Sequence, residues 1–128
     1  MEMKLELVPI PVSDVDRAKV FYVTQVGFHA DHDLEAGNGV RIVQLTPPGS
    51  ACSIVMGTGM GEISAMLPGT LKALHLVVVD IHEARETLRA RGVNVSDVEN
   101  LGGVQYAHFS DPDGNTWALQ ELLPPGLD

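Results

Sequence analysis

The sequence predicts an α+β fold built from two similar modules in tandem, because one residue pattern occurs twice along the chain. An aspartate that opens a helical pattern is found at Asp14 and again, 66 residues later, at Asp80. The helical patterns end near Gly27 and Gly92, and each lies between an apolar strand-like run and a hairpin-like pair of strands. This duplication predicts two similar half-sheets that face each other across a pseudo-two-fold axis, with any functional cleft between them.

In the first copy, the strand-like run extends from Leu5 to Val12, and the hairpin comprises Val40–Leu45 and Ala51–Met56. Ser13 or Asp14 can cap the helix, because a side-chain oxygen there accepts a free N–H group of the first turn. Apolar residues at helical spacing then predict one buried stripe, formed by Val15, Ala18, Phe21, Tyr22 and Val26.

The second copy repeats these elements in the same order. Its strand-like run is Leu74–Val79, and its hairpin comprises Val104–Phe109 and Thr116–Leu122. Asp80 is expected to cap the helix, and Gly92 is expected to supply the left-handed residue at its end. The repeat therefore covers nearly the whole chain.

The chain is expected to be a single domain over residues 1–128. Module one would span about residues 1–57, a linker about 58–70 and module two about 71–128. The linker starts with the run Gly57–Gly61, which is too rich in glycine for a strand and lacks the lysine of a phosphate-binding loop. We interpret it as a connection between the modules that can arch over the cleft.

The charge of the chain excludes several kinds of partner. Seventeen acidic residues against eight basic ones give a formal net charge of −9, which repels nucleic acid and anionic membranes. No apolar run approaches the roughly 20 residues of a membrane helix, and the N-terminus lacks the features of a signal peptide. The single cysteine, Cys52, agrees with a reducing compartment, so we expect a cytoplasmic protein with a small-molecule or protein partner.

Two stretches carry a resemblance to a known family. They are Pro11–Tyr22 with Val26–Phe28, and Ser110–Asn115, at matching places in the two copies. Together they resemble the vicinal oxygen chelate superfamily, which contains glyoxalase I, extradiol dioxygenases, fosfomycin-resistance enzymes and bleomycin-resistance proteins. The segment Asn115–Glu121 resembles a glyoxalase-like branch of it. The resemblance implies two βαβββ modules that form a half-open mixed β-barrel with the helices outside.

Enzymes of this superfamily usually hold a divalent metal on the concave face of the sheet, with ligands from the first and last strands of each module. The resemblance places the corresponding positions at Leu7, Ser53, Ala73 and Ala118. None of these side chains supplies an imidazole, carboxylate or thiolate donor. Shifts of two residues offer only His75 and Gln120, so we expect no metal and no other cofactor.

Alternate residues of a strand share one face of a sheet, so the same positions predict what lines the cleft. The resulting surface is mainly apolar with a few polar groups, as in many small-molecule pockets. The expected ligand-binding residues are Leu7, Pro9, Ser53, Val55, His75, Val77, Ala118 and Gln120. Leu5, Ala73 and Leu122 are expected on the same face, and Trp117 in the core on the helix side.

Three polar positions leave alternatives open. His75 lies in the most apolar strand, either as a buried, satisfied histidine or as a group that binds a ligand or transfers a proton. The run His29–Asp33 resembles a metal cluster in composition, but its place after the helix favours a solvated acidic loop or edge strand. His108 and its repeat-mate Gln44 can face the cleft or the helices, and the 57–70 linker can reach the cleft or not.

Three functions fit these observations. The first is a metal-independent protein that binds a small apolar or aromatic molecule, as bleomycin-resistance proteins sequester an antibiotic; the acidic charge suits cationic ligands. The second is a lyase, isomerase or dioxygenase, with or without a metal, and in its metal-free form His75 would be the catalytic acid–base. Its metal-dependent form would need His75, Gln120 and either His108 or Glu121 to converge on one ion. The third is an interaction module with a vestigial cleft.

The last expectation concerns assembly. Two-module chains of this family usually pair, and a half-open barrel leaves strand edges and an apolar concavity that a partner can cover. Pro9 and Pro11 suit an edge strand, where no ladder donor is needed. We expect a symmetric homodimer with ligand sites near the interface.

Overall fold

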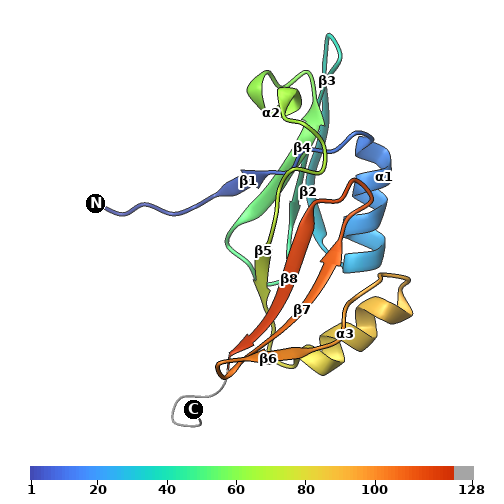
Figure 1. Ribbon diagram of the computed structural model, residues 1–128. Helices are drawn as coiled ribbons and strands as arrows, with labels where there is room; N and C mark the ends of the chain where they lie inside the picture. Colours follow the sequence, from blue (N-terminus) through green and yellow to red (C-terminus); the bar gives the residue numbers. More distant parts are fainter. Residues whose placement is uncertain (123–128) are drawn as a thin grey trace.

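The computed structural model describes residues 1–122 and contains two four-stranded sheets with matching strand orders (Figure 1). The first sheet has the order β1-β4-β3-β2 and the second the order β5-β8-β7-β6. Each sheet with its helix forms one βαβββ module, so the α+β class and the duplication predicted from the sequence are confirmed. Residues 123–128, the expected end of module two, lie outside the described residues.

Module one is built around a sheet in which β1 is parallel to β4 and the other neighbours are antiparallel. Its elements are β1 (Leu7–Pro9), α1 (Val15–Val20), the π-helical segment η1 (Phe21–Val26), β2 (His29–Gly37), β3 (Val40–Thr46) and β4 (Ser53–Thr58). β1 is shorter than the expected run from Leu5 to Val12, and beyond its C-terminal end Pro11 lacks the N–H group that would continue the ladder. It lies at the edge of its sheet, where such prolines are tolerated.

Module two repeats this topology, with β5 parallel to β8. Its elements are β5 (Leu74–Val77), α3 (Ile81–Ala90), β6 (Glu99–Leu101), β7 (Val104–Ser110) and β8 (Thr116–Leu122). The linker between the modules contains the short helix α2 (Glu62–Ala65). Among residues 1–122, no helix has the length and apolar content needed to cross a membrane.

The helix ends form as the sequence predicts. The carboxylate of Asp14 accepts the N–H of Arg17 at 3.0 Å, and Asp80 accepts the N–H of Glu83 at 3.1 Å. These contacts satisfy free donors in the first turns of α1 and α3. Gly27 closes the first helical run with a φ of 100°, a conformation that favours glycine.

One apolar core joins the two modules on the helix side of both sheets. Figure 1 shows α1 and α3 on the same side of the molecule. Trp117 of module two lies in this core, as predicted, with its ring centroid 5.7 Å from that of Tyr22 and 5.6 Å from that of Phe28. Aromatic contacts of this kind add to the stabilisation from burial of the apolar surface.

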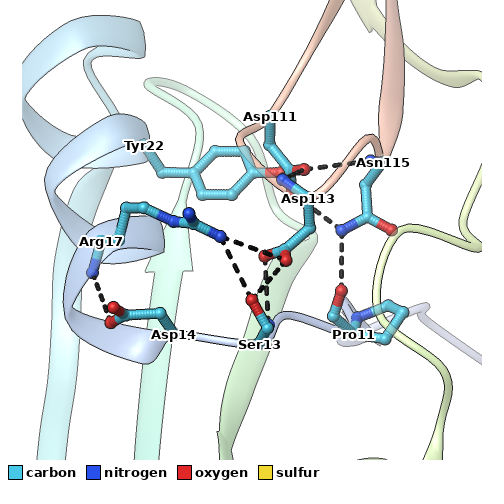
Figure 2. A network of polar contacts seen from close by, with 8 residues as sticks. All are labelled: Pro11, Ser13, Asp14, Arg17, Tyr22, Asp111, Asp113 and Asn115. Atoms are coloured by element: carbon cyan, nitrogen blue, oxygen red, sulfur yellow. Dashed lines mark hydrogen bonds and ion pairs between the residues drawn. The ribbon is translucent and has the colours of Figure 1, made fainter.

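A buried polar network crosses the same junction (Figure 2). The hydroxyl of Tyr22 donates to the carboxylate of Asp111 at 2.7 Å, and the Trp117 indole N–H donates to the Tyr22 oxygen at 2.9 Å. The side-chain amide of Asn115 donates both to Asp111 and to the carbonyl oxygen of Pro11, each at 2.8 Å. Burial and the neighbouring Asp111 raise the pKa of Tyr22 far above its ordinary value, so the hydroxyl remains a donor.

The turn that follows Asp111 makes a second set of contacts with module one (Figure 2). The carboxylate of Asp113 accepts the Ser13 hydroxyl at 2.6 Å and the Ser13 N–H at 3.1 Å. Arg17 lies 3.3 Å from the same carboxylate and forms a partly exposed ion pair with it. The Asp-Pro-Asp-Gly-Asn turn therefore fixes the start of α1 against module two.

The network predicts a specific loss of stability in Tyr22→Phe. The change leaves the Trp117 N–H without its acceptor and removes one donor from the buried Asp111 carboxylate. We expect the free energy of unfolding to fall by about 1–3 kcal/mol, measured by urea denaturation. The matched control is Tyr106→Phe, which removes the other tyrosine hydroxyl and should change stability by less than about 0.5 kcal/mol. Equal losses in the two variants would contradict this account.

Candidate functional site

The predicted residues of module one lie together on the face of the first sheet that points away from the helices. The register pairs Leu7 with Ser53 and Pro9 with Val55. Directly paired residues share a face, so these four side chains form two adjacent rows. The next residue of β4, Ile54, belongs to the helix-side core, as alternation requires.

The predicted residues of module two form the equivalent face of the second sheet. His75 pairs with Ala118, and Val77 pairs with Gln120. Val77 is 66% exposed, and Leu122 on the same face is 55% exposed. The part of this face around Val77 and Leu122 is therefore open and partly apolar in the single chain, whereas Ala118 on the same face is buried.

Three further side chains, polar or aromatic, lie on this face. The sequence left two of them undecided and did not predict the third. The register places Gln44 opposite Val55 and His108 opposite Ala118, so both lie on the face of the predicted set. Tyr106, which sequence reasoning missed, lies opposite Gln120. Tyr106 lies two residues before His108 on β7, so the two side chains share a face of the sheet. The sequence left the face of His108 open and therefore did not indicate Tyr106.

The polar corner of the first sheet contains a short chain of hydroxyl groups. Thr46 and Ser53 are hydrogen-bonded through their side-chain oxygens at 2.6 Å, and the Thr46 hydroxyl also donates to Asp31. The His29 ring nitrogen Nε2 lies 3.8 Å from Asp31. The run His29–Asp33 thus belongs to the edge strand β2, one of the two alternatives that its sequence allowed.

The structure corrects the position equivalent to Leu7 in module two. The Ile10 N–H donates to the carbonyl oxygen of Val55, and the Val78 N–H donates to the carbonyl oxygen of Gln120, each at 2.9 Å. These equivalent bonds align β1, the first strand of module one, with β5, the first strand of module two. This pairing makes His75, and not Ala73, the equivalent of Leu7. Counting back from the helix failed because the connection from β5 to α3 is two residues shorter than that from β1 to α1.

The corrected set allows a test of the metal site that the family implies. The four corresponding positions hold Leu7, Ser53, His75 and Ala118, which supply one imidazole and one hydroxyl group. A protein site for a divalent metal needs three or four imidazole, carboxylate or thiolate donors, so this set does not fit one. Within residues 1–122, no cluster of three or more His, Cys, Asp or Glu side chains has a metal-binding arrangement.

Glu121 also lies away from this set, contrary to the hypothesis that it could join His75 on an ion. Its carboxylate accepts the N–H of Ile81 at 2.8 Å and the side-chain amide of Gln105 at 2.9 Å. It therefore stabilises the N-terminus of α3 on the helix side of the sheet.

A cavity of about 400 Å³ lies elsewhere, at the junction of the modules on the helix side of β5. Phe28, Pro47 and Pro48 line it from module one, and residues of β5 and α3 line it from module two. Of the predicted ligand-binding residues, it includes Val77 alone. The cavity therefore adjoins the open face of β5 at Val77 and is otherwise a distinct candidate site.

The linker packs close to the ends of the two modules. The Ser64 hydroxyl of α2 donates to the carbonyl oxygen of Gly57 at the end of β4, at 3.2 Å. The Gly69 N–H donates to the carbonyl of Pro11 at 3.3 Å. A Cβ atom at Gly69 would lie 2.2 Å from the carbonyl oxygen of Asp113, so this approach requires glycine.

Comparison with known proteins assigns the family. The model of the Glyoxalase/Bleomycin resistance protein/Dioxygenase superfamily matches residues 4–119, and the chain therefore belongs to this superfamily. Among curated proteins, none matches the sequence.

Solved structures of the same family share this fold. TnmS3, an antibiotic binding protein from Streptomyces sp. CB03234, is 34% identical, with a TM-score of 0.82 over 95% of this chain and 98% of its own. A glyoxalase/bleomycin resistance protein from the same organism is 37% identical, with a TM-score of 0.76 over 91% and 98%. A superfamily member from Sphaerobacter thermophilus DSM 20745 is 32% identical, with a TM-score of 0.80 over 94% and 98%.

Proposed function

We propose that the protein is a metal-independent binding protein that sequesters a small antibiotic-like or aromatic molecule on the open sheet faces. The observation that carries the proposal is the composition of these faces, where accessible apolar side chains such as Leu7, Val77 and Leu122 lie beside a few polar groups. The similarity to an antibiotic binding protein at 34% identity supports the same class of function.

The physical basis of binding is the apolar surface that the core leaves uncovered. Val77 and Leu122 are more than half exposed, and a ligand that covers them gains roughly 25 cal/mol for each Å² removed from water. His75 and Gln120 add hydrogen-bonding groups that can orient the ligand. The net charge of −9 favours a cationic ligand, because the field of the protein concentrates cations near its surface.

Binding on these faces is tested by a compound screen that measures the melting temperature. Aromatic and antibiotic-like compounds that bind should raise it by mass action. In Leu7→Trp, the larger side chain should occupy the face and abolish the shift. The control Val20→Trp places the same side chain on the exposed surface of α1 and should leave the shift unchanged. A screen without any shift, or equal shifts in both variants, would contradict the proposal.

Metal independence follows from the poor donor set at Leu7, Ser53, His75 and Ala118. Protein purified without chelator should contain no stoichiometric Ni, Zn, Mn or Fe by elemental analysis. Addition of EDTA should leave its melting temperature unchanged, because no bound ion stabilises the fold. Stoichiometric metal that is lost in His75→Ala would instead favour the alternative function as a lyase, isomerase or dioxygenase.

We further propose that the sheet faces are completed in a symmetric homodimer. β1 and β5 are edge strands, whose outer backbone groups can pair with another strand. Leu5 is 70% exposed and Val79 is 97% exposed beside these edges. Figure 1 shows the N-terminal segment before β1 projecting away from the sheets. An antiparallel contact between β1 of one copy and β5 of a second copy would cover both strand edges. It would also place the module-one face of one copy beside the module-two face of the other.

Light scattering should report a dimer at micromolar concentration. In a Cys52→Ser background, a chain with Leu5→Cys mixed with a chain with Val79→Cys should form a covalent heterodimer under mild oxidation. In the control, the first chain carries Val20→Cys, on the exposed face of α1, in place of Leu5→Cys. This mixture should give no covalent heterodimer. A monomer by light scattering would contradict the dimer, and a dimer without the specific cross-link would contradict this interface.

A further inference from the structure

The imidazole of His75 has a defined protonation pattern, because its own chain segment holds one ring nitrogen. Nδ1 lies 2.7 Å from the carbonyl oxygen of Ala73. A carbonyl oxygen only accepts hydrogen bonds, so Nδ1 carries the proton in this contact. In the neutral ring, Nε2 therefore has a free lone pair and acts as a hydrogen-bond acceptor.

The backbone of Ala73 is strained in the conformation that makes this contact. Its φ is 60°, and among the described residues the other non-glycine residue with positive φ is Asn38, in the hairpin turn between β2 and β3. Asparagine is favoured in such turns, whereas alanine has no comparable preference. The Ala73 N–H donates to the side-chain oxygen of Thr116 at 2.7 Å, which holds the residue in place. Strain held in this way beside a candidate ligand residue points to a functional role for the carbonyl.

The surroundings of His75 indicate the kind of ligand that meets Nε2. The ring of Tyr106 lies edge-on to the imidazole, with centroids 5.9 Å apart and planes at 86°. Val77, two residues along β5, is 66% exposed on the same face. An aromatic ligand lying against Val77 and Tyr106 can bring a ring substituent to His75. A hydroxyl group there would donate to Nε2 and satisfy the free acceptor.

We propose that His75 is the specificity-determining residue of the ligand site and selects aromatic ligands that carry a hydroxyl group. This inference rests on the proposed small-molecule binding function and names its ligand class. A ligand without the hydroxyl covers Nε2 and leaves it without a partner, so its binding should be about fivefold to tenfold weaker. Ala73 and Thr116 are positioning residues, because they act on the ligand only through the orientation of His75.

The tautomer is measured first, without any ligand. Nitrogen NMR of histidine-labelled protein at about pH 8, where an ordinary imidazole is neutral, should show the proton of His75 on Nδ1. Loss of the signal in His75→Phe assigns it. Ala73→Gly still allows a positive φ and should keep this tautomer, whereas Thr116→Val should produce a mixture. A proton on Nε2 in the unaltered protein would overturn the inference.

Ligand choice is measured next, by calorimetry with 2-naphthol and 2-methoxynaphthalene. The naphthol should bind about fivefold to tenfold more tightly, and His75→Phe should bring the two affinities within about twofold. His82→Phe, on the exposed surface of α3 and away from both sheet faces, should leave the preference unchanged. Equal binding of both compounds, or a preference that survives in His75→Phe, would overturn the inference. If neither compound binds, this ligand class is wrong, whereas the wider compound screen still decides the binding function.

Discussion

The carboxylate of Asp111 accepts hydrogen bonds from both modules, and the relative position of the two sheets depends on this buried group. Tyr22 contacts it from the helical segment of module one, and Asn115 contacts it from the turn of module two. A buried carboxylate is tolerated only when donors of this kind replace water. Asn115 also accepts the N–H of Leu71 at 3.1 Å. The network therefore reaches the segment that leads through Ala73 to His75, and it links the stability of the junction to the geometry of the candidate site.

This arrangement separates the stabilising core from the surface available for ligands. The aromatic cluster around Trp117 fills the helix side of the sheets, where close packing leaves little freedom for change. The opposite faces carry Val77 and Gln120 without a covering layer in the single chain, and Val77 is more than half exposed. Substitutions at the exposed positions of these faces, such as Val77, are expected to cost little stability. Members of one fold family can in this way bind different molecules, since function depends on the site and not on the fold.

The duplicated fold could be predicted because its signals are local: a capping aspartate such as Asp14, a terminal glycine such as Gly92, and alternation along the hairpins. Register across connections could not be predicted in the same way. The equivalent of Leu7 was expected at Ala73 and is His75, because the loop before α3 is shorter and sequence spacing does not reveal loop length. The place of Tyr106 depends on its pairing with β8, which no local pattern specifies. The Asp111 network was also missed, since its partners are far apart in the sequence.

The central claim is that ligands bind on the sheet faces away from the helices and not in the helix-side cavity. Methyl NMR of the protein, titrated with a compound that raises its melting temperature, tests this directly. The account predicts that the largest shifts occur at Leu7 and Leu122, which lie on the faces of β1 and β8 away from the helices and do not line the cavity. Largest shifts at Val26 and Leu88, which line the cavity at the module junction, would contradict it.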